Sequence, residues 1–129
     1  MNKTILATGT ALGIVTIILG AFAAHGLERV LSQDAINTFE TGVRYQMYNA
    51  LFFMLMGSLR GVNETLRKWS FILAFVGTIF FSGSIYLLAT NTLTSFDFRV
   101  IGLITPLGGT LMIIGWSLLL VGILKLKKK

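Results

Sequence analysis

Long apolar blocks divide the chain, and short polar segments separate them. The first block runs from Ile5 to Ala24 and another from Trp69 to Thr90, and neither contains a charged residue. The last block, Val100 to Leu124, is also uncharged. A helix needs about 20 consecutive apolar residues to cross the roughly 30 Å of hydrocarbon in a bilayer. The pattern therefore predicts membrane-spanning helices over these three ranges.

A further block, Asp34 to Leu59, gathers its polar residues at one end. Glu40 and Arg44 are four residues apart with the glutamate first, the favourable order for a pair on one helix face. Counting back from Arg60 at about 1.5 Å per residue puts Asn49 at about 16 Å and Arg44 at about 24 Å. Arg44 can then reach the outer interface, whereas Asn49 lies near the middle of the bilayer. We predict a span here too, second in chain order.

The connections between the blocks are short. Glu28 to Asn37 is polar, with room for a turn at Glu28 to Leu31, and Ser32 is predicted to cap the helix that follows. Arg60 to Lys68 and Asn91 to Arg99 form the other two loops. We predict an all-α fold, a single domain over residues 1–129 that forms an integral membrane four-helix up-and-down bundle.

The distribution of basic residues predicts the orientation in the membrane. With four spans, the N-terminus, the second loop and the C-terminal tail share one side. That side carries eight basic residues: Lys3, Arg60, Arg67, Lys68, Lys125, Lys127, Lys128 and Lys129. The opposite side carries three: Arg29, Arg44 and Arg99. Because cytoplasmic loops are enriched in Lys and Arg, both termini are predicted to be cytoplasmic.

The composition is typical of an integral membrane protein. Apolar residues make up 54% of the 129 residues, charged residues make up 12%, and the mean hydropathy is +0.80. Such an excess of apolar surface has to face lipid. The net charge of +6 does not indicate nucleic-acid binding, because the positive-inside rule accounts for it. The sequence contains no cysteine, which excludes disulfides, thiolate metal sites and a cysteine nucleophile.

The first block has an alternative interpretation as a cleaved signal peptide. Met1 to Lys3 is positive, and Ala21-Phe22-Ala23 resembles the small-x-small site that precedes cleavage, here before Ala24. Against cleavage, three glycines recur on one helix face at spacings of four and seven residues: Gly9, Gly13 and Gly20. Such small-residue faces let helices approach closely in a membrane, so we favour a retained span.

The last block carries a second glycine face. Gly108, Gly115 and Gly122 repeat every seven residues and offer a groove to a neighbouring helix. Pro106 removes one backbone hydrogen bond, and its ring crowds the carbonyl group of Gly102. The sequence therefore predicts a kink in this helix near Pro106.

The predicted topology gathers hydrogen-bonding side chains toward the outer leaflet, with Asn49 below them. This candidate cluster comprises His25, Glu40, Arg44, Gln46, Asn49, Tyr86 and Thr105, with Asp97 and Arg99 in the adjoining loop. One interpretation is structural: Arg44 pairs with Glu40, and Asn49 bonds to a neighbouring helix and sets its register. The alternative is a binding site for a small molecule, an ion or a lipid headgroup, because polar residues inside membranes often mark function.

Metal and phosphate chemistry find little support in the sequence. His25 is the single histidine, so a zinc site would need carboxylates such as Glu28, Asp34 or Glu40. Gly108-Gly109 lies inside an apolar block and not between a strand and a helix, so it does not resemble a phosphate-binding loop. We predict no cofactor and no metal site.

Nucleophilic catalysis is the remaining chemical alternative. It would need Ser82 or Ser84 beside His25, with Asp97 or Glu40 as the acid. Nothing in the spacing of these residues demands that arrangement. We therefore predict no catalytic residues.

The chain resembles a family of small bacterial integral membrane proteins of unknown function, the YwdK and YgdD type, grouped as domain of unknown function family 423. The likeness rests on four blocks that together cover nearly the whole chain: Gly20 to Leu27, Thr41 to Leu51, Phe81 to Leu87, and Ile104 to Gly109 with Gly115-Trp116. The resemblance implies four inner-membrane spans and no particular activity. That family commonly has His at the position of Asn49 and Gly at that of Ala23. Because Asn does not titrate, the first departure argues against proton transfer there.

The sequence thus predicts a small polytopic membrane protein without catalysis of its own, which packs with itself, with lipids or with partner membrane proteins. The alternative is binding or transport of a small molecule, an ion or a lipid headgroup through the outer polar cluster. A membrane enzyme is the third interpretation.

Overall fold

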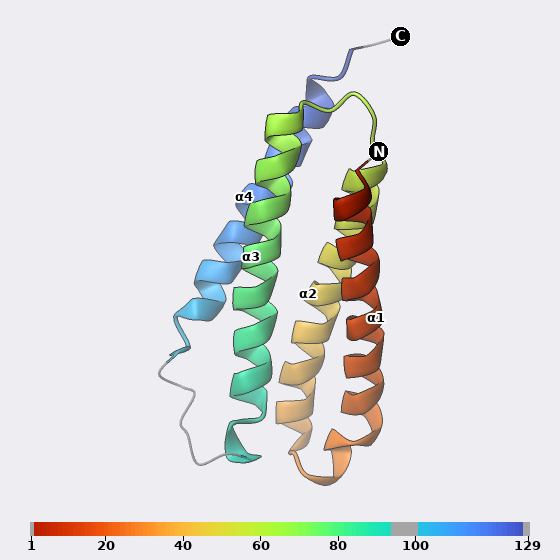
Figure 1. The fold of residues 1–129 in the computed structure, drawn as a ribbon. Helices are drawn as coiled ribbons and strands as arrows, with labels where there is room; N and C mark the ends of the chain where they lie inside the picture. The colour runs from red at the N-terminus through yellow and green to blue at the C-terminus, as the bar shows by residue number, and fades with distance from the viewer. Residues whose placement is uncertain (1, 94–100, 128–129) are drawn as a thin grey trace.

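A computed structural model describes residues 2–93 and 101–127 of the chain. These residues form helices and turns and contain no strand, which confirms the predicted all-α class. Figure 1 labels the four long helices: α1 (Lys3–His25), α2 (Gln33–Ser58), α3 (Glu64–Ala89) and α4 (Ile104–Leu124). Two short 3-10 helices, η1 (Leu27–Arg29) and η2 (Asn91–Leu93), follow α1 and α3.

Three segments are long and apolar enough to cross a membrane: Lys3–Arg29, which contains α1, and the helices α3 and α4. This agrees with the three uncharged blocks of the sequence. The helix α2 has 26 residues, but its first half carries Asp34, Glu40 and Arg44. At about 1.5 Å per residue it is nevertheless roughly 39 Å long, more than the hydrocarbon thickness.

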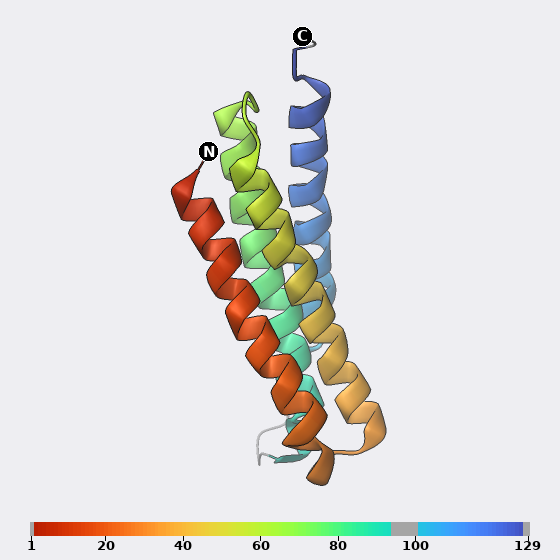
Figure 2. The same ribbon diagram turned by 90° about the vertical axis from the view of Figure 1, so that its right-hand side faces the viewer.

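The long helices pack mainly against their neighbours in the sequence. Close contacts join α1 to α2, α2 to α3 and α3 to α4. Figures 1 and 2 show α1 and α4 at opposite edges of the assembly, with both ends of the chain at the same end of the molecule. The face between α2 and α4 is therefore not covered by α1, and this open face holds the groove described below.

Helix ends are set by asparagine and serine caps. The Ser32 hydroxyl accepts a hydrogen bond from the backbone nitrogen of Ala35 at 3.2 Å, which confirms the predicted cap of α2. Asn63 caps α3 in the same way, since its Oδ1 accepts from the backbone nitrogens of Thr65 and Leu66. This cap starts α3 at Glu64, five residues before the predicted span, and so brings Arg67 into the helix and not into a loop.

The predicted kink at Pro106 is wrong. The helix α4 begins at Ile104 and not at the predicted Val100, which lies outside the described residues. Pro106 therefore sits in the first helical turn, where backbone N–H groups have no partner within the helix in any case. A proline there removes no hydrogen bond from the span and favours the start of the helix.

The apolar core has two parts, one near each end of the bundle. The part beside the chain termini is built on Ile5, Phe52, Phe53, Met56, Val62, Ala74 and Leu119. The part at the other end is built on Ala23, Leu27, Leu31, Ile36, Phe39 and Ala89. Many large apolar side chains point outward instead, including Ile17, Leu103 and Ile113 at 64%, 84% and 68% exposure. Outward apolar side chains on all sides suit a lipid solvent.

Several of the predicted packing glycines lie where backbones meet. A β-carbon at Gly115 would stand 2.8 Å from the carbonyl oxygen of Ser70, and one at Gly9 would stand 2.7 Å from that of Ala50. Gly108 meets the backbone of α3, and Gly122 meets the side chain of Val62. The two remaining positions have more room, with nearest atoms 4.0 Å away at Gly13 and 3.5 Å away at Gly20. The closest backbone contacts thus fall in the α3–α4 and α1–α2 pairs.

Candidate functional site

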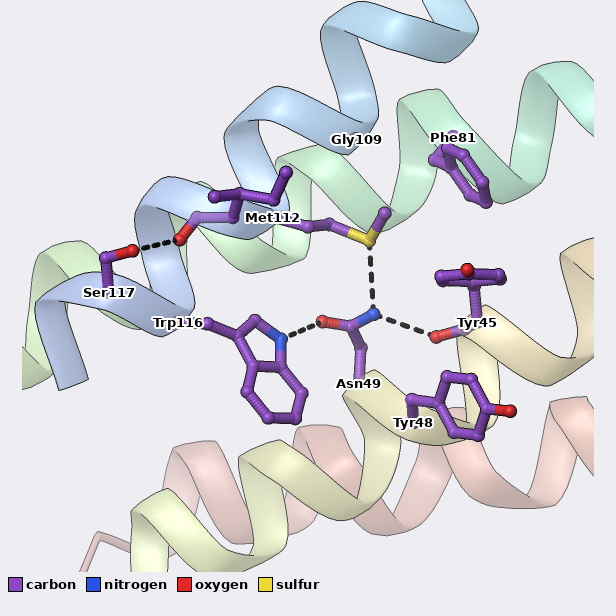
Figure 3. Close-up of a pocket in the computed structure, with 9 residues that line it drawn as sticks. Tyr45, Tyr48, Asn49, Phe81, Gly109, Met112, Trp116 and Ser117 are labelled. Carbon is purple, nitrogen blue, oxygen red and sulfur yellow. Dashed lines mark hydrogen bonds between the residues drawn. The ribbon is translucent and has the colours of Figure 1, made fainter. Parts of the chain in front are cut away.

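Asn49 lies in the middle of α2 and joins this helix to α4. Its amide nitrogen donates to the backbone oxygen of Tyr45 at 2.8 Å and to the sulfur of Met112 at 3.1 Å. Its Oδ1 accepts a hydrogen bond from Nε1 of Trp116 at 3.1 Å (Figure 3). The Trp116 ring in turn stacks on Phe52, with 4.0 Å between the ring centres. Both polar atoms of the Asn49 side chain thus have partners within the protein, and the residue is 2% exposed.

A groove of about 530 Å³ opens beside this amide. Its walls come from α2, α3 and α4 and are formed by Tyr45, Tyr48, Asn49, Phe81, Gly109, Met112, Ile113, Trp116 and Ser117 (Figure 3). Most of these side chains are aromatic or aliphatic, and both polar atoms of the Asn49 side chain already bond within the protein. The volume is within the range of sites for small organic molecules. The groove therefore suits an apolar occupant.

Two members of the predicted polar cluster bond directly to each other. The Tyr86 hydroxyl in α3 donates to Oε1 of Gln46 in α2 at 2.5 Å. One turn away, the Ser82 hydroxyl donates to the carbonyl oxygen of Gly42 at 2.8 Å. Gly42 leaves room for the Tyr86 ring, because a β-carbon there would stand 2.7 Å from Cε1 of the ring. These contacts fix the register of α2 against α3.

The other members of the predicted cluster take different partners. Thr105 shares a hydrogen bond of 2.5 Å with Ser84, which joins α3 to the start of α4. Arg44 donates to the Thr41 hydroxyl at 3.0 Å, and the ion pairs of the described residues do not include one between Arg44 and Glu40. His25, at the end of α1, is exposed. The hydrogen bonds of the described residues therefore do not join these side chains into one network.

The residues considered for catalysis and metal binding also separate. Ser82 and Ser84 bond to Gly42 and Thr105, and the described part of the chain holds no hydrogen bond from either to His25. Within the same residues, no group of three or more His, Asp or Glu side chains lies close enough to hold a metal ion. Asp97 and Arg99 lie outside the described residues.

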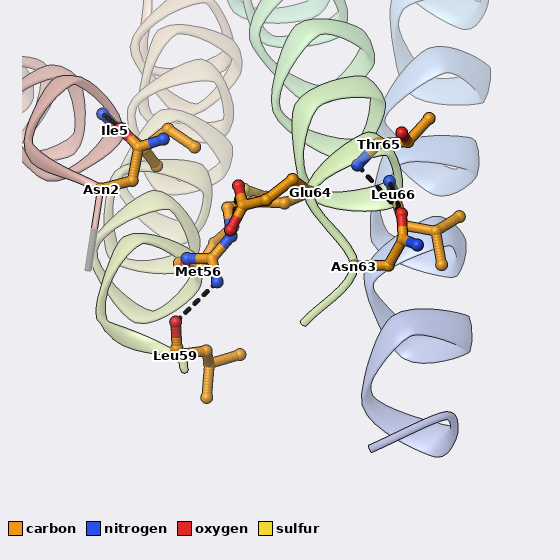
Figure 4. Close-up of polar contacts among 9 residues, drawn as sticks. Asn2, Ile5, Met56, Leu59, Asn63, Glu64, Thr65 and Leu66 are labelled. Carbon is orange, nitrogen blue, oxygen red and sulfur yellow. Dashed lines mark hydrogen bonds and ion pairs between the residues drawn. The ribbon is translucent and has the colours of Figure 1, made fainter. Parts of the chain in front are cut away.

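Arg67 is the polar residue that the sequence pattern placed wrongly. It was expected in a cytoplasmic loop, but it lies in the first turn of α3 and is 2% exposed. Its Nη1 donates to the carbonyl oxygen of Met56 at 2.8 Å, and its Nη2 donates to that of Leu59 at 2.7 Å. Glu64 lies 3.6 Å from Nε (Figure 4 shows Met56, Leu59 and Glu64).

These bonds give Arg67 a structural role at the end of α2. The last carbonyl groups of a helix have no partner within it and carry the negative end of the helix dipole. The guanidinium group donates to one of these carbonyls, that of Met56, and to the carbonyl of Leu59, the residue that follows the helix. Its positive charge also complements the negative end of the helix dipole. A sequence signal existed, because Asn63 followed by Glu64 predicts a helix start, and Arg67, Ser70 and Ala74 then share one face.

Comparison with known proteins identifies relatives along nearly the whole chain. A UPF0382 membrane protein of Staphylococcus saprophyticus is 38% identical over 124 residues, which cover 96% of this chain and 99% of the relative. The UPF0382 membrane protein YwdK of Bacillus subtilis is 34% identical over 128 residues, with 95% and 98% covered. The UPF0382 inner membrane protein YgdD of Escherichia coli is 34% identical over 118 residues, with 91% and 86% covered.

No solved structure matches the chain. The family described as "Protein of unknown function (DUF423)" matches residues 19–109, a stretch that contains Asn49, the groove walls on α2 and α3, and the start of α4. This match confirms the expected resemblance to a family of membrane proteins of unknown function. The chain belongs to the DUF423 family of membrane proteins.

Proposed function

We propose that this protein crosses the plasma membrane four times as an up-and-down bundle with both termini in the cytoplasm. The helix α2 supports a fourth span because it is roughly 39 Å long at about 1.5 Å per residue. The two ends of the chain lie at one end of the molecule in Figure 1, which supports a shared side for the termini. The side with the termini carries eight basic residues and the opposite side carries three, which supports the cytoplasm as the side of the termini.

The topology can be tested with single cysteines, because the natural chain contains none. We expect a membrane-impermeant maleimide applied to intact spheroplasts to label a cysteine at Asn37 but not one at Asn63 or Lys127. The last two should react only after the membrane is opened. Labelling of Asn63 and Lys127 from opposite sides would contradict the four-span arrangement. Both positions are exposed, so a lack of reaction reports sidedness and not burial.

Within this topology, we propose that the protein is a non-catalytic lipid-binding membrane protein whose groove beside Asn49 holds the acyl chain of a bilayer lipid. The groove carries the proposal: it is about 530 Å³ in volume, and aromatic and aliphatic side chains dominate its walls. Tyr48, Trp116 and Ile113 at its margin are 50%, 45% and 68% exposed, so the groove is open to the surrounding lipid. A hydrocarbon chain needs no polar partner, and both polar atoms of the Asn49 side chain already bond to groups of the protein.

The predicted alternative, a polar ligand or ion among the outer side chains, has less support. The Tyr86 hydroxyl donates to Oε1 of Gln46, and Thr105 bonds to Ser84. Their contacts are also split between the α2–α3 and α3–α4 interfaces. Three of the side chains that were expected to form one site, Gln46, Tyr86 and Thr105, thus link helices to each other.

Lipid occupancy can be tested with a phospholipid that carries a photoreactive diazirine on its acyl chain. We expect cross-links to the α4 segment that contains Trp116. Leucine at Gly109 should fill the groove and reduce the cross-linking about tenfold. A loss of roughly 1.4 kcal/mol in the free energy of lipid binding is enough for that ratio. The substitution is tolerable because a β-carbon at Gly109 would have its nearest neighbour, in Phe81, at 3.7 Å.

Leucine at Thr110 provides the matched control, because this neighbouring residue on α4 is exposed and does not line the groove. It should leave the cross-linking unchanged. Equal labelling in both variants would contradict the proposed acyl-chain site.

A further inference from the structure

A second cavity lies at the end of the molecule where the chain terminates, and its polar walls are basic. It has a volume of about 750 Å³ and lies between the α2–α3 loop and the end of α4. Arg60 comes from the loop, and Lys125 and Lys127 come from the segment after α4. Within residues 2–93 and 101–127, no acidic residue lines it. We call it the basic pocket.

The segment after α4 is held against the protein and does not hang free. The backbone nitrogen of Leu126 donates to the carbonyl oxygen of Ile123 at 3.0 Å, and that of Lys125 donates to Val121 at 3.1 Å. The Leu126 side chain packs on the apolar core. It also reaches the loop, since its Cδ2 lies 3.4 Å from the place of a β-carbon at Gly61. Leu126 thereby fixes Lys125 and Lys127 on either side of it.

The loop that contributes Arg60 is also fixed. Gly61 has φ +83°, a conformation that side-chain-bearing residues rarely adopt, and it turns the chain between α2 and α3. The next residue, Val62, is buried in the core and packs against α4 at Gly122, where a β-carbon would meet Val62 Cγ1 at 2.9 Å. The two basic walls of the pocket are therefore held at a set separation by apolar contacts beneath them.

The cations of the pocket have no carboxylate partner among the described residues. The ion pair among the described residues joins Glu64 to Arg67. Both residues line a different and smaller cavity, together with Lys68. Arg60, Lys125 and Lys127 thus share one concave surface without a compensating negative charge. Like charges held together repel one another, and a bound anion relieves that repulsion.

We propose that the basic pocket binds a phosphate group, carried by an anionic phospholipid of the adjoining leaflet or present as free phosphate. A guanidinium group matches two phosphate oxygens at once, and the two ammonium groups add charge-assisted hydrogen bonds. The pocket lies beyond the end of α4, at the depth where lipid headgroups lie if the four-helix topology holds. The site is separate from the groove beside Asn49, and neither depends on the other.

The test uses the full-length protein purified in a non-ionic detergent, so that it does not depend on orientation in cells. The protein is mixed with equal amounts of phosphatidylglycerol and phosphatidylcholine with the same acyl chains, and native mass spectrometry counts the bound lipids. We expect about a tenfold preference for the anionic lipid, a ratio that a single charge-assisted contact can supply. The double variant Arg60→Gln/Lys125→Gln should reduce the preference to about twofold or less.

The double variant Lys3→Gln/Lys68→Gln is the matched control. It removes the same charge from the same end of the molecule, but neither residue lines the basic pocket. It should keep the preference of the wild type. An equal loss in both double variants, or no preference in the wild type, would overturn the proposal, because net charge alone would then explain binding.

A second arm separates the two sources of phosphate. Inorganic phosphate is titrated into the protein in phosphatidylcholine nanodiscs, and binding is measured by calorimetry. Binding of phosphatidylglycerol without measurable binding of inorganic phosphate assigns the site to a lipid headgroup. If inorganic phosphate binds to the wild type and not to Arg60→Gln/Lys125→Gln, the site is assigned to free phosphate. If neither anion binds, the proposal is wrong, whatever the result for the acyl-chain groove.

Discussion

Leucine at Gly115 is expected to force α3 and α4 apart and to lower the free energy of unfolding by about 3 kcal/mol. A β-carbon at this position would stand 2.8 Å from the Ser70 carbonyl oxygen and 2.9 Å from the Ala74 backbone nitrogen. Both are backbone atoms, so no side chain can move aside to make room. The change would also displace the Gly115 carbonyl oxygen, which accepts a hydrogen bond of 2.6 Å from the Ser70 hydroxyl.

Unfolding of the purified protein in mixed micelles, with increasing dodecyl sulfate and circular dichroism as the readout, measures this loss. Alanine at Gly115 and alanine at Gly83 make a matched pair, because each adds one methyl group inside or beside the same α3–α4 pair of helices. A β-carbon at Gly83 has no atom within 4 Å, so that variant should be neutral or gain up to about 1 kcal/mol from helix propensity. Wild-type stability of Gly115→Leu would contradict the close-packed interface.

Alanine at Arg67 is expected to lower the free energy of unfolding by about 3 kcal/mol. The change leaves the carbonyl oxygens of Met56 and Leu59 without their charged donor in a place that is closed to water. A hydrogen bond from a charged group contributes about 1.5–3 kcal/mol, and the negative end of the α2 dipole loses a neighbouring cation as well. The cost is larger than for an exposed basic residue, whose interactions water replaces.

Three comparison variants separate the causes of this loss. Lysine at Arg67 keeps the charge but cannot reach both carbonyls with one planar group, so we expect about half of the effect. Methionine at Arg67 keeps an apolar stem and removes the hydrogen bonds together with the charge. Alanine at the exposed Arg60 removes the same charge and should change the unfolding free energy by less than about 0.5 kcal/mol. A similar loss for alanine at Arg60 and at Arg67 would count against the buried role.

The sequence indicates the groove beside Asn49 only in part. Asn49 was recognisable as a polar residue deep in an apolar helix, and a bond from it to another helix was expected. Its partners were not, because Met112 and Trp116 look like ordinary lipid-facing residues of α4. A contact between residues more than 60 positions apart depends on how helices rotate and slide against each other.

The predicted polar cluster also shows that the sequence alone does not identify which side chains contact each other. Depth along each helix predicts one leaflet for His25, Arg44, Gln46, Tyr86 and Thr105, but depth says nothing about the direction in which a side chain points around its helix. In the structure Gln46 points to α3, while Arg44 bonds to Thr41 on its own helix. Residues at one depth can therefore face different neighbours.

The sequence by itself determined that this is an all-α membrane protein with three uncharged spans, because about 20 apolar residues in a row leave a helix in lipid as the favourable state. It also determined the cap of α2 at Ser32, since capping is local. Only the tertiary structure decided that Arg67 is buried at the end of α2, that Asn49 closes one side of an apolar groove, and that Leu126 holds two lysines beside Arg60. These features depend on helix rotation and close approach, which arise from contacts between distant segments of the chain.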